Sequence, residues 1–473
     1  MVLKLTLTSP HEAETQIEIS LRQAFISLEP SLKPPFSLAI PNSDDYTHLN
    51  RAILHGVLAE PHLAKTHIKH LHGIVTDGYS TFINLLLDIV HTLYPKLLAP
   101  VKTQLLWVTE EMVHVSAIGF EPLLLTLLRQ ILGGDFSDGN LWLCSKMVTL
   151  FLENWECFLD EAPSVLCSAL YVFLRVLHDH CSVNVEKLKT LRRLEIHFCV
   201  KVVREEFHLC LKIGRDFIRL LQDLVHVPEF QAIWKDLMVN PSSFNTPEFV
   251  GVSQFYHTRT SSKYALLRIS PEMETQLRFL LTYVKFGNHK RHQLWFGRKF
   301  LNEPDKETVI VDMVKFICCA HHPPNEIIQS DIVPRWAVIG WLLKCCRKNH
   351  VENSVKLALF YDWLFFDGRV DNIMNIEPAM LLMVHCIPKY IDITNALLGF
   401  LLHLLDTYDV QHKDVIVKGV GSAFHSLASK GVIQSLDVLT SCPALSPLLR
   451  ECLGRLLSDL KLGSSNGFLT GQF

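Results

Sequence analysis

Two clusters of cysteine and histidine contain the ligand types that a zinc site requires. The first runs from Cys318 to His322, and the second is made up of His62, His67, His70 and His72. Adjacent ligands chelate a tetrahedral ion less readily than the Cys-x2-Cys spacing does, and no second pair completes the first cluster. The histidines lack the carboxylate of a His-Glu-x-x-His motif. We interpret the first cluster as a helix end and the second as surface and groove residues. A metal site is the alternative, and no cofactor is predicted.

Two glycine-containing segments could in principle cradle a phosphate group. They are Gly133 to Gly139 and Gly419 to Gly421. Neither has a Walker lysine or a preceding strand, so we interpret both as helix stops. The sequence also has no Gly-x-Ser-x-Gly motif and no carboxylate pair in a polar context. We therefore predict that the chain is not an enzyme, since catalysis requires convergent ionisable groups.

A basic and aromatic segment from Lys285 to Lys299 is a candidate nucleic-acid or acidic-partner site. Phosphates together with stacked bases require this mixture of cations and rings in single-strand binding. The alternative is that Phe286, Trp295 and Phe296 pack inward at helical spacing while the cations are solvated. The candidate residues of the patch are Lys285, Lys290, Arg291, Trp295, Arg298 and Lys299.

Composition gives no sign of a globally charged or membrane-embedded protein. The 473 residues include 45 Lys and Arg against 48 Asp and Glu, and 49% of residues are hydrophobic. A formal net charge of -3 provides no global field for nucleic acid. The longest apolar spans, 165–176 and 396–405, fall short of the ~20 residues that a bilayer requires. Cysteines within apolar runs indicate a reduced compartment. We expect a soluble cytosolic or nuclear protein.

Apolar residues recur at helical spacing along most of the chain. In the segment 81–93, Phe82, Leu86 and Ile89 fall on one helix face. Proline and glycine end such segments at short intervals, which predicts antiparallel helix pairs. We predict an all-α, HEAT/armadillo-like α-solenoid. Asp77 and Asp138 are expected helix N-caps, and the segment 309–311 is a weak strand candidate.

One segment is apolar on nearly every side. Trp336 to Leu343 contain no charged residue, and a helix of this composition must be covered by neighbours. We expect this helix in the interior of the stack. The proposed divisions are an N-terminal segment of one helix and a proline-containing loop (1–44), two helical-repeat halves (45–240 and 241–462) and a disordered tail (463–473).

Six ordered strings of the chain are distinctive. They are I-G-R-D-F-I-R-L-L-Q-D (213–223), P-E-F-Q-A-I-W-K-D (228–236), V-K-F-G-N-H-K-R-H-Q-L-W-F (284–296), S-D-I-V-P-R-W-A-V-I-G-W-L-L (330–343), K-L-A-L-F-Y-D-W-L-F-F (356–366) and I-M-N-I-E-P-A (373–379). These strings closely resemble the N-terminal region of the Integrator complex subunit 3 family, whose members also belong to the SOSS complex, the sensor of single-stranded DNA. Two further strings, T-Q-L-L-W (103–107) and L-W-L-C-S-K-M-V (141–148), extend the resemblance, which covers about residues 45–440.

The resemblance implies a nuclear, non-enzymatic scaffold, with the cytoplasm left open as a second location. Expected partners are other Integrator subunits, a small OB-fold single-stranded-DNA-binding protein and a short third SOSS subunit. The implied processes are the DNA-damage response and small nuclear RNA 3′-end processing. Nucleic acid is then expected to bind mainly to the OB-fold partner. Full-length family members carry a further C-terminal helical region, which nothing after about Ser458 resembles.

A surface for such a partner is expected in the N-terminal half. Its core should be an apolar anchor surrounded by a polar rim, as in other protein interfaces. Candidate polar residues are Gln104, Glu110, Glu111 and Lys146. The competing hypothesis is direct single-stranded nucleic-acid binding through residues 285–299.

Overall fold

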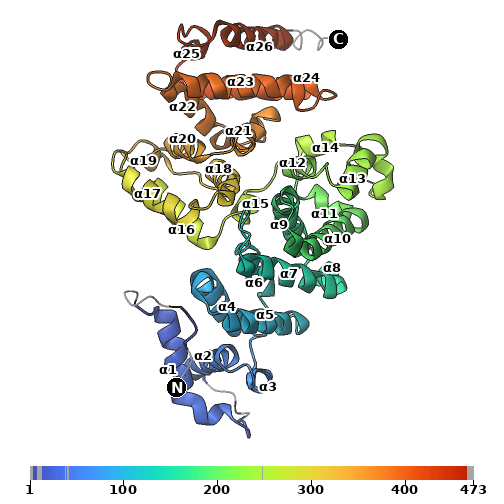
Figure 1. Ribbon diagram of the computed structural model, residues 1–473, viewed down its shortest axis with the longest axis vertical. Coiled ribbons are helices and arrows are strands. Elements are labelled where there is room, and N and C mark those ends of the chain that lie inside the picture. The colour runs from blue at the N-terminus through green and yellow to red at the C-terminus, as the bar shows by residue number, and fades with distance from the viewer. Residues whose placement is uncertain (1–3, 8–12, 38, 40–41, 248, 466–473) are drawn as a thin grey trace, which may run out of the picture. The chain divides into compact units, whose positions relative to one another are not determined.

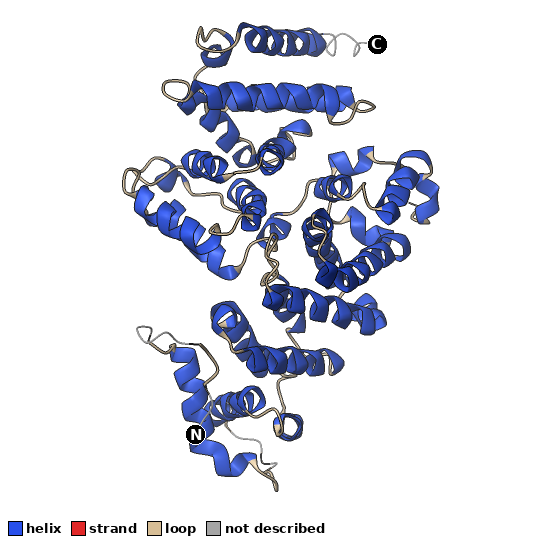
Figure 2. Ribbon diagram, viewed as in Figure 1, coloured by secondary structure: helices blue, strands red, loops and turns tan. Residues whose placement is uncertain are grey.

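The computed structural model describes residues 4–7, 13–37, 39, 42–247 and 249–465. Over these residues the chain is helical, and its β-structure is limited to two isolated bridges, Thr6 with Leu97 and Lys285 with Ile332 (Figure 2). The prediction of an all-α protein is confirmed. The weak strand candidate at 309–311 was wrong, because these residues begin a buried helix, Val309–Cys319.

The chain divides into two compact units, each built from helices joined by short turns (Figure 1). The first unit comprises residues 1–203 with 270–272, and the second comprises 204–269 with 273–473. The α-helices that begin before residue 204 are α1 (Gln16–Leu28), α2 (Ser43–Ala59), α3 (Ala64–Ile74), α4 (Ser80–Thr92), α5 (Ala99–His114), α6 (Phe120–Leu128), α7 (Asp138–Glu153), α8 (Trp155–Glu161), α9 (Pro163–Ser182) and α10 (Lys189–Glu205).

The remaining α-helices follow α10. They are α11 (Phe207–Leu211), α12 (Arg215–Asp223), α13 (Pro228–Val239), α14 (Ser253–His257), α15 (Ser262–Leu266), α16 (Pro271–Tyr283), α17 (His289–Phe300), α18 (Val309–Cys319), α19 (Asn325–Ile328), α20 (Arg335–Cys345), α21 (Asn349–Leu364), α22 (Glu377–Cys386), α23 (Ile391–Thr407), α24 (Lys413–Ser429), α25 (Asp437–Thr440) and α26 (Pro447–Ser465). Six short 3-10 helices are η1 (Glu29–Leu32), η2 (Tyr94–Lys96), η3 (Glu186–Leu188), η4 (Pro241–Phe244), η5 (Asp305–Thr308) and η6 (Ile373–Asn375).

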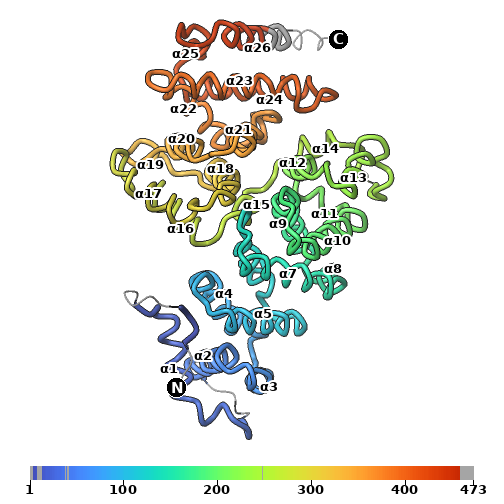
Figure 3. Tube along the Cα trace, in the orientation of Figure 1, coloured from blue at the N-terminus to red at the C-terminus, as the bar shows by residue number. Residues whose placement is uncertain are grey.

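Successive helices of the second unit pack in two layers. In one layer α18 contacts α21, α21 contacts α24, and α24 contacts α26. In the other, α20 contacts α22 and α22 contacts α23, while the α21–α23 and α23–α24 contacts join the layers. The Cα trace runs back and forth through these helices, as Figure 3 shows. This stack of paired helices is a helical-repeat architecture.

In the first unit a buried carboxylate holds the N-terminal segment against α1. Glu18 accepts hydrogen bonds from the backbone amides of Leu5 and Thr6, at 3.0 and 3.2 Å, and from the Thr6 hydroxyl. The Leu7 amide in turn donates to the Lys96 carbonyl in η2. Residues 5–7 therefore join the unit through specific hydrogen bonds rather than through a helix of their own.

The helix caps correct both predictions. The N-cap of α4 is Tyr79 rather than Asp77, although the Asp77 carboxylate accepts a hydrogen bond from the Thr81 amide in the first turn of that helix at 2.7 Å. Asp138 is the first residue of α7, and the cap is the preceding Ser137, whose hydroxyl accepts from the Asn140 amide. The predicted start of this helix was therefore wrong by one residue.

The prediction that Gly419 and Gly421 stop a helix was wrong. Both lie inside α24. A Cβ atom added to Gly419 would lie 2.3 Å from the Leu364 carbonyl oxygen at the end of α21. The glycine is therefore required for close approach between two helices. By contrast, Gly133 and Gly134 do lie between α6 and α7, whereas Gly139 is the second residue of α7.

The charge-free segment from Trp336 to Leu343 is only half covered. Within α20, Val338, Ile339 and Leu342 are buried, whereas Trp336 and Trp341 are half-buried. The expectation that neighbours cover this helix on every side was wrong, because one face lines an open pocket. An apolar composition alone does not distinguish a buried face from a pocket wall.

The boundary between the two compact units lies at a different residue from the boundary between the two predicted halves. The structure places the boundary at Val203 and Arg204, so that α11 to α13 belong to the second unit. Residues 463–465 end α26, and residues 466–473 of the expected tail lie outside the described residues.

No single helix in the described part of the chain has the length and apolar composition to cross a membrane. The bent pair α8 and α9 meets those criteria only when combined.

Candidate functional site

Four residues of the predicted basic and aromatic patch form an outward-facing stripe on α17. Arg291, Trp295 and Arg298 lie at positions i, i+4 and i+7, which share one helix face, and all three are exposed. The Lys299 ammonium lies 5.3 Å from the centre of the Trp295 ring. The structure therefore places one lysine against an exposed indole and two arginines on the same helix face.

The other two patch residues lie away from this stripe. Lys285 precedes α17 and forms an ion pair with Asp331, with 2.8 Å between Nζ and Oδ2. This side-chain hydrogen bond raises the pKa of Lys285 and lowers that of Asp331. Lys290 lines a pocket on another side of α17. The six residues therefore do not form one continuous binding surface.

The aromatic residues of the patch are divided between core and surface. Phe296 is buried, whereas Phe286 and Trp295 are 52% and 43% exposed. The alternative in which all three pack inward thus describes only Phe296. A row of contacting rings continues from Trp295 through His292 to Phe279, with centroids 5.6 and 5.4 Å apart.

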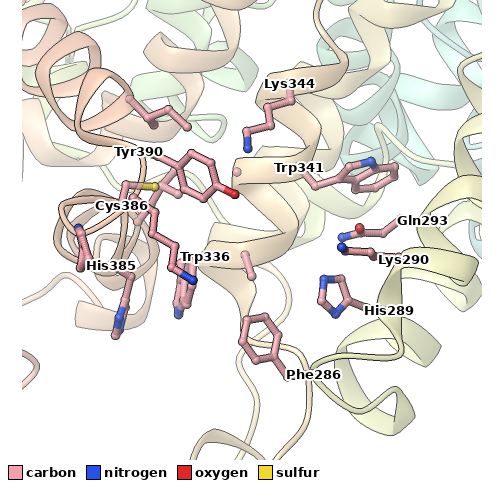
Figure 4. Close-up of a pocket in the computed structure, with 16 residues that line it drawn as sticks. Phe286, His289, Lys290, Gln293, Trp336, Trp341, Lys344, His385, Cys386 and Tyr390 are labelled. Carbon is pink, nitrogen blue, oxygen red and sulfur yellow. The ribbon is translucent and has the colours of Figure 1, made fainter.

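An open pocket of about 560 Å³ lies beside α17 in the second unit. Figure 4 shows α20 between two walls, with Trp336, Trp341 and Lys344 pointing into the space. One wall consists of Phe286 and the α17 residues His289, Lys290 and Gln293. The opposite wall comes from α22, the turn after it and the first turn of α23, and its residues are Leu382, His385, Cys386, Pro388, Lys389, Tyr390 and Ile393.

Three aromatic rings of the pocket already contact other side chains through their faces. Trp336 is stacked on His385, with centroids 4.6 Å apart and planes 16° apart. Phe286 is stacked on His289 at 5.1 Å. The Lys344 ammonium lies 4.0 Å from the centre of the Tyr390 ring, in cation–π geometry. These contacts fix the orientation of the rings that border the pocket.

The pocket carries positive charge without a carboxylate in its lining. Lys290, Lys344 and Lys389 are exposed lysines of the lining. None of the three is in an ion pair with a carboxylate in the part of the chain that the structure describes. Burial lowers the pKa of His289, and the neighbouring Lys290 lowers it further. The site combines apolar surface with cations and is suited to an anionic ligand that has an apolar part.

The predicted partner surface in the first unit lies on two adjacent helices. Gln104, Glu110 and Glu111 are half-buried residues of α5, and Lys146 is an exposed residue of α7. α5 packs against α7. Gln104 and Glu111 are seven residues apart and share a helix face, whereas Glu110 is turned about 100° from Glu111. We therefore retain this surface as a prediction.

The histidine cluster does not form a single group. His62 and His72 are exposed as expected, but His67 and His70 in α3 are buried, so their interpretation as surface residues was wrong. His70 is stacked on Phe36, and His67 Nε2 lies 3.1 Å from Glu60 Oε2. Burial lowers the pKa of both His67 and His70.

The cysteine and histidine residues at 318–322 mark the end of α18, as predicted. Their side chains have separate partners. The Cys319 thiol donates to Asp362 Oδ2 at 3.1 Å, and His322 Nε2 lies 3.0 Å from the Cys318 carbonyl oxygen. Burial raises the pKa of Cys318 to about 12. The arrangement therefore gives no common centre for a ligand.

Sequence reasoning missed a buried group formed by Cys144, His180 and Glu195. Their possible ligand atoms lie within 4.8 Å of one another. The two Glu195 oxygens lie 2.9 and 3.0 Å from His180 Nδ1. Burial raises the pKa of Glu195, and of the Cys144 thiol. Because the carboxylate and imidazole already pair with each other, we interpret them as a structural pair. The residues come from α7, α9 and α10, so no local motif signals them.

A buried network of charges joins four segments of the second unit. Lys315 in α18 lies 3.2 Å from Asp216 in α12 and 3.9 Å from Asp362 in α21. Arg215 pairs with Asp371 at 3.2 Å. The Tyr361 hydroxyl donates to the Arg215 carbonyl at 2.6 Å. These groups are enclosed and paired with one another, which is the arrangement of a structural network rather than of an open reactive site.

The fold and the site define an all-α helical-repeat protein with an open apolar and cationic pocket. Comparison with known proteins is more specific. Residues 44–455 match the family described as Integrator complex subunit 3 N-terminal. The chain belongs to this family, as its sequence strings predict.

Individual relatives agree with this assignment. The chain is 38% identical over 397 residues to Integrator complex subunit 3 of Mus musculus, an alignment that covers 84% of this chain and 38% of the relative. It is 40% identical over 404 residues to the Dictyostelium discoideum homolog, an alignment that covers 85% of this chain and 26% of that relative. It is 34% identical over 460 residues to the Drosophila erecta homolog, an alignment that covers 96% of this chain and 42% of that relative. The chain thus spans less than half the length of these relatives.

Proposed function

We propose that this chain is a non-enzymatic scaffold subunit of an Integrator assembly. The observation that carries the proposal is the family match over residues 44–455. A stack of paired helices supports it, because such stacks present extended surfaces to partners. The enclosed charge network around Lys315 also supports it, since these ionisable groups are paired with one another.

We further propose that the chain takes part in a SOSS-type assembly. There it holds a small OB-fold single-stranded-DNA-binding protein and a short third subunit. The assembly acts in the DNA-damage response, and the Integrator assembly acts in small nuclear RNA 3′-end processing, both in the nucleus. The resemblance of the quoted strings to the family supports these roles. Nucleic acid then reaches the scaffold mainly through the OB-fold partner.

Co-expression with a small OB-fold single-strand-binding protein tests the scaffold function. We expect the two proteins to co-elute from a size-exclusion column at high ionic strength. Charge reversal of Glu111 and Lys146 together leaves the net charge unchanged and should weaken the complex if the α5–α7 surface is the docking site. Failure of the unaltered chain to associate would contradict the proposal itself. Unchanged association of the variant would contradict only the assigned surface.

The alternative function is direct binding of single-stranded nucleic acid through residues 285–299. It is favoured by one observation, the exposed stripe of Arg291, Trp295 and Arg298. Titration of the purified chain with oligothymidylate at ~50 mM salt tests it, because phosphate contacts are strongest at low salt. Binding that disappears in the double variant Arg291→Glu, Arg298→Glu would support direct contact. No binding by the unaltered chain would exclude it.

A further inference from the structure

We propose that the pocket between α17, α20 and the α22–α23 turn binds a short acidic peptide segment of a partner protein. An aromatic or leucine side chain of that segment occupies the space beside Trp336 and Trp341. Carboxylates on either side of it pair with Lys290, Lys344 and Lys389. This inference deepens the proposed scaffold function and rests on it, because the peptide belongs to a protein that the scaffold holds.

The shape of α20 provides the space for an apolar anchor. Between its two tryptophans on the pocket side lie Ala337 and Gly340, the smallest residues of the lining. Gly340 also allows α20 to approach α22 closely, because a Cβ atom added to it would lie 3.0 Å from Leu382 Cδ1. The volume of about 560 Å³ is in the range of pockets that enclose compact ligands. It can therefore take a large side chain and part of its backbone.

The charges of the lining determine which sign of charge the ligand should carry. The three lysines come from three different elements, namely α17, α20 and the α22–α23 turn. No Asp or Glu lines the pocket. Cations arranged around an apolar centre complement carboxylates that flank an apolar residue, and such rim charges govern both recognition and association rate. The chemistry therefore fits an acidic linear segment rather than a neutral or basic one.

The same geometry is less suited to a nucleic acid. Stacked bases require open ring faces. In this pocket one face of Trp336 is covered by His385, and one face of Phe286 is covered by His289. The Lys344 ammonium covers a face of Tyr390. Each of these three rings therefore has at most one open face, which provides fewer stacking surfaces for a row of bases than for one inserted side chain.

Selection from a displayed library of random dodecapeptides by the purified full chain tests the proposal without any other protein of the assembly. We expect the selected peptides to share Asp or Glu on both sides of a central Trp, Phe or Leu. Their affinity is then measured by fluorescence anisotropy. Replacing the selected acids by Asn and Gln should weaken binding by about tenfold, as expected when paired rim charges are lost.

Matched variants assign the binding to the pocket. The double variant Lys344→Glu, Lys389→Glu should bind the selected peptide with an affinity lower by about tenfold or more. The control, Lys235→Glu with Lys430→Glu, makes the same change in net charge at exposed residues of the same unit outside the lining and should have little effect. Ala337→Glu, which fills the apolar centre with a charge, should also abolish binding while the melting temperature shows that the chain is folded.

Three outcomes would overturn the proposal. The first is a selection that enriches no peptide or only neutral and basic peptides. The second is equal weakening by the pocket and control variants. The third is complete competition by oligothymidylate that depends on Lys344 and Lys389, which would assign the pocket to nucleic acid. Because no OB-fold protein is present, each outcome can occur whether or not the co-elution experiment supports the scaffold function.

Discussion

The Lys315 ammonium lies 3.2 Å from the Asp216 carboxylate although both side chains are almost fully buried, with 3% and 1% of their surface exposed. Burial alone would lower the pKa of Lys315, but Asp216 and Asp362 outweigh it and raise the pKa above its ordinary value. The lysine therefore stays charged inside the second unit. It connects α12, α18 and α21 through charge rather than through apolar contact.

Replacing this lysine should strongly destabilise the second unit. Lys315→Met leaves Asp216 and Asp362 buried with less compensation, which typically costs about 3–5 kcal/mol. Urea unfolding followed by circular dichroism measures the change. Lys348→Met removes the exposed ion pair with Asp305 and should cost less than about 1 kcal/mol. Equal losses for the two variants would show that the network does not depend on Lys315.

A single methyl group at Gly419 should separate α24 from α21. Gly419→Ala places Cβ against the Leu364 carbonyl, and overpacking of this kind costs about 1–3 kcal/mol. Gly454→Ala in α26 is the matched control, because nothing lies within 4 Å of its added Cβ. That change should be neutral or stabilising by up to about 1 kcal/mol. Thermal unfolding distinguishes the two, and a stable Gly419 variant would contradict the close contact.

The stability of the first unit should fall in mild acid because of His55. Burial, and secondarily the charge of Arg22, lower the pKa of His55 to about 4, whereas a histidine in the unfolded chain has a pKa near ~6.5. Between pH 4 and pH ~6.5 the unfolded state therefore binds more protons at this histidine than the folded state does. The contribution of neutral His55 is therefore complete above pH ~6.5 and is lost toward pH 4, by up to about 3 kcal/mol.

Urea midpoints between pH 7.5 and 4.5 measure this effect. His55→Phe keeps a ring beside Phe25, which contacts His55 with centroids 4.9 Å apart, and it should flatten the pH dependence. His62→Gln, at an exposed position, is the control and should leave the slope unchanged. If His55→Phe retains the slope of the unaltered chain, the acid sensitivity arises from other groups.

Two neighbouring positions of α20 should respond differently to a charge. Leu342 is buried, and Leu342→Asp should unfold the unit because an unpaired charge in the core is strongly unfavourable. Trp341 is half-buried in the pocket lining, and Trp341→Asp should leave a folded chain that has lost the acidic peptide. Near-ultraviolet circular dichroism together with peptide anisotropy separates these effects. A Trp341 variant that unfolds like Leu342→Asp would assign it to the core.

Helical periodicity was sufficient to predict the fold class, because the burial of residues such as Phe82 and Ile89 follows directly from their spacing. It could not predict the role of Gly419, since a glycine needed for close helix approach resembles one that ends a helix. The pocket could not be predicted from the sequence either. Lys290, Lys344 and Tyr390 are brought together by the packing of α17, α20 and α22, and no local pattern encodes that packing.

The quoted strings contained more information than the periodicity. They identified the family, which the match over residues 44–455 confirms. They did not locate a binding surface, because core and pocket residues occur side by side in the same string. In V-I-G-W-L, for example, Ile339 is buried, Gly340 and Trp341 line the pocket, and Leu342 is buried again.

The stacking of His385 on Trp336 has a consequence for the speed of recognition. An indole fixed by its neighbour before a ligand arrives has little rotational freedom left to lose, so the entropic cost of ordering it on binding is small. A flexible partner then bears nearly all of the ordering cost. Association should accordingly proceed in a single kinetic phase whose rate increases linearly with peptide concentration, without a slow rearrangement of the scaffold.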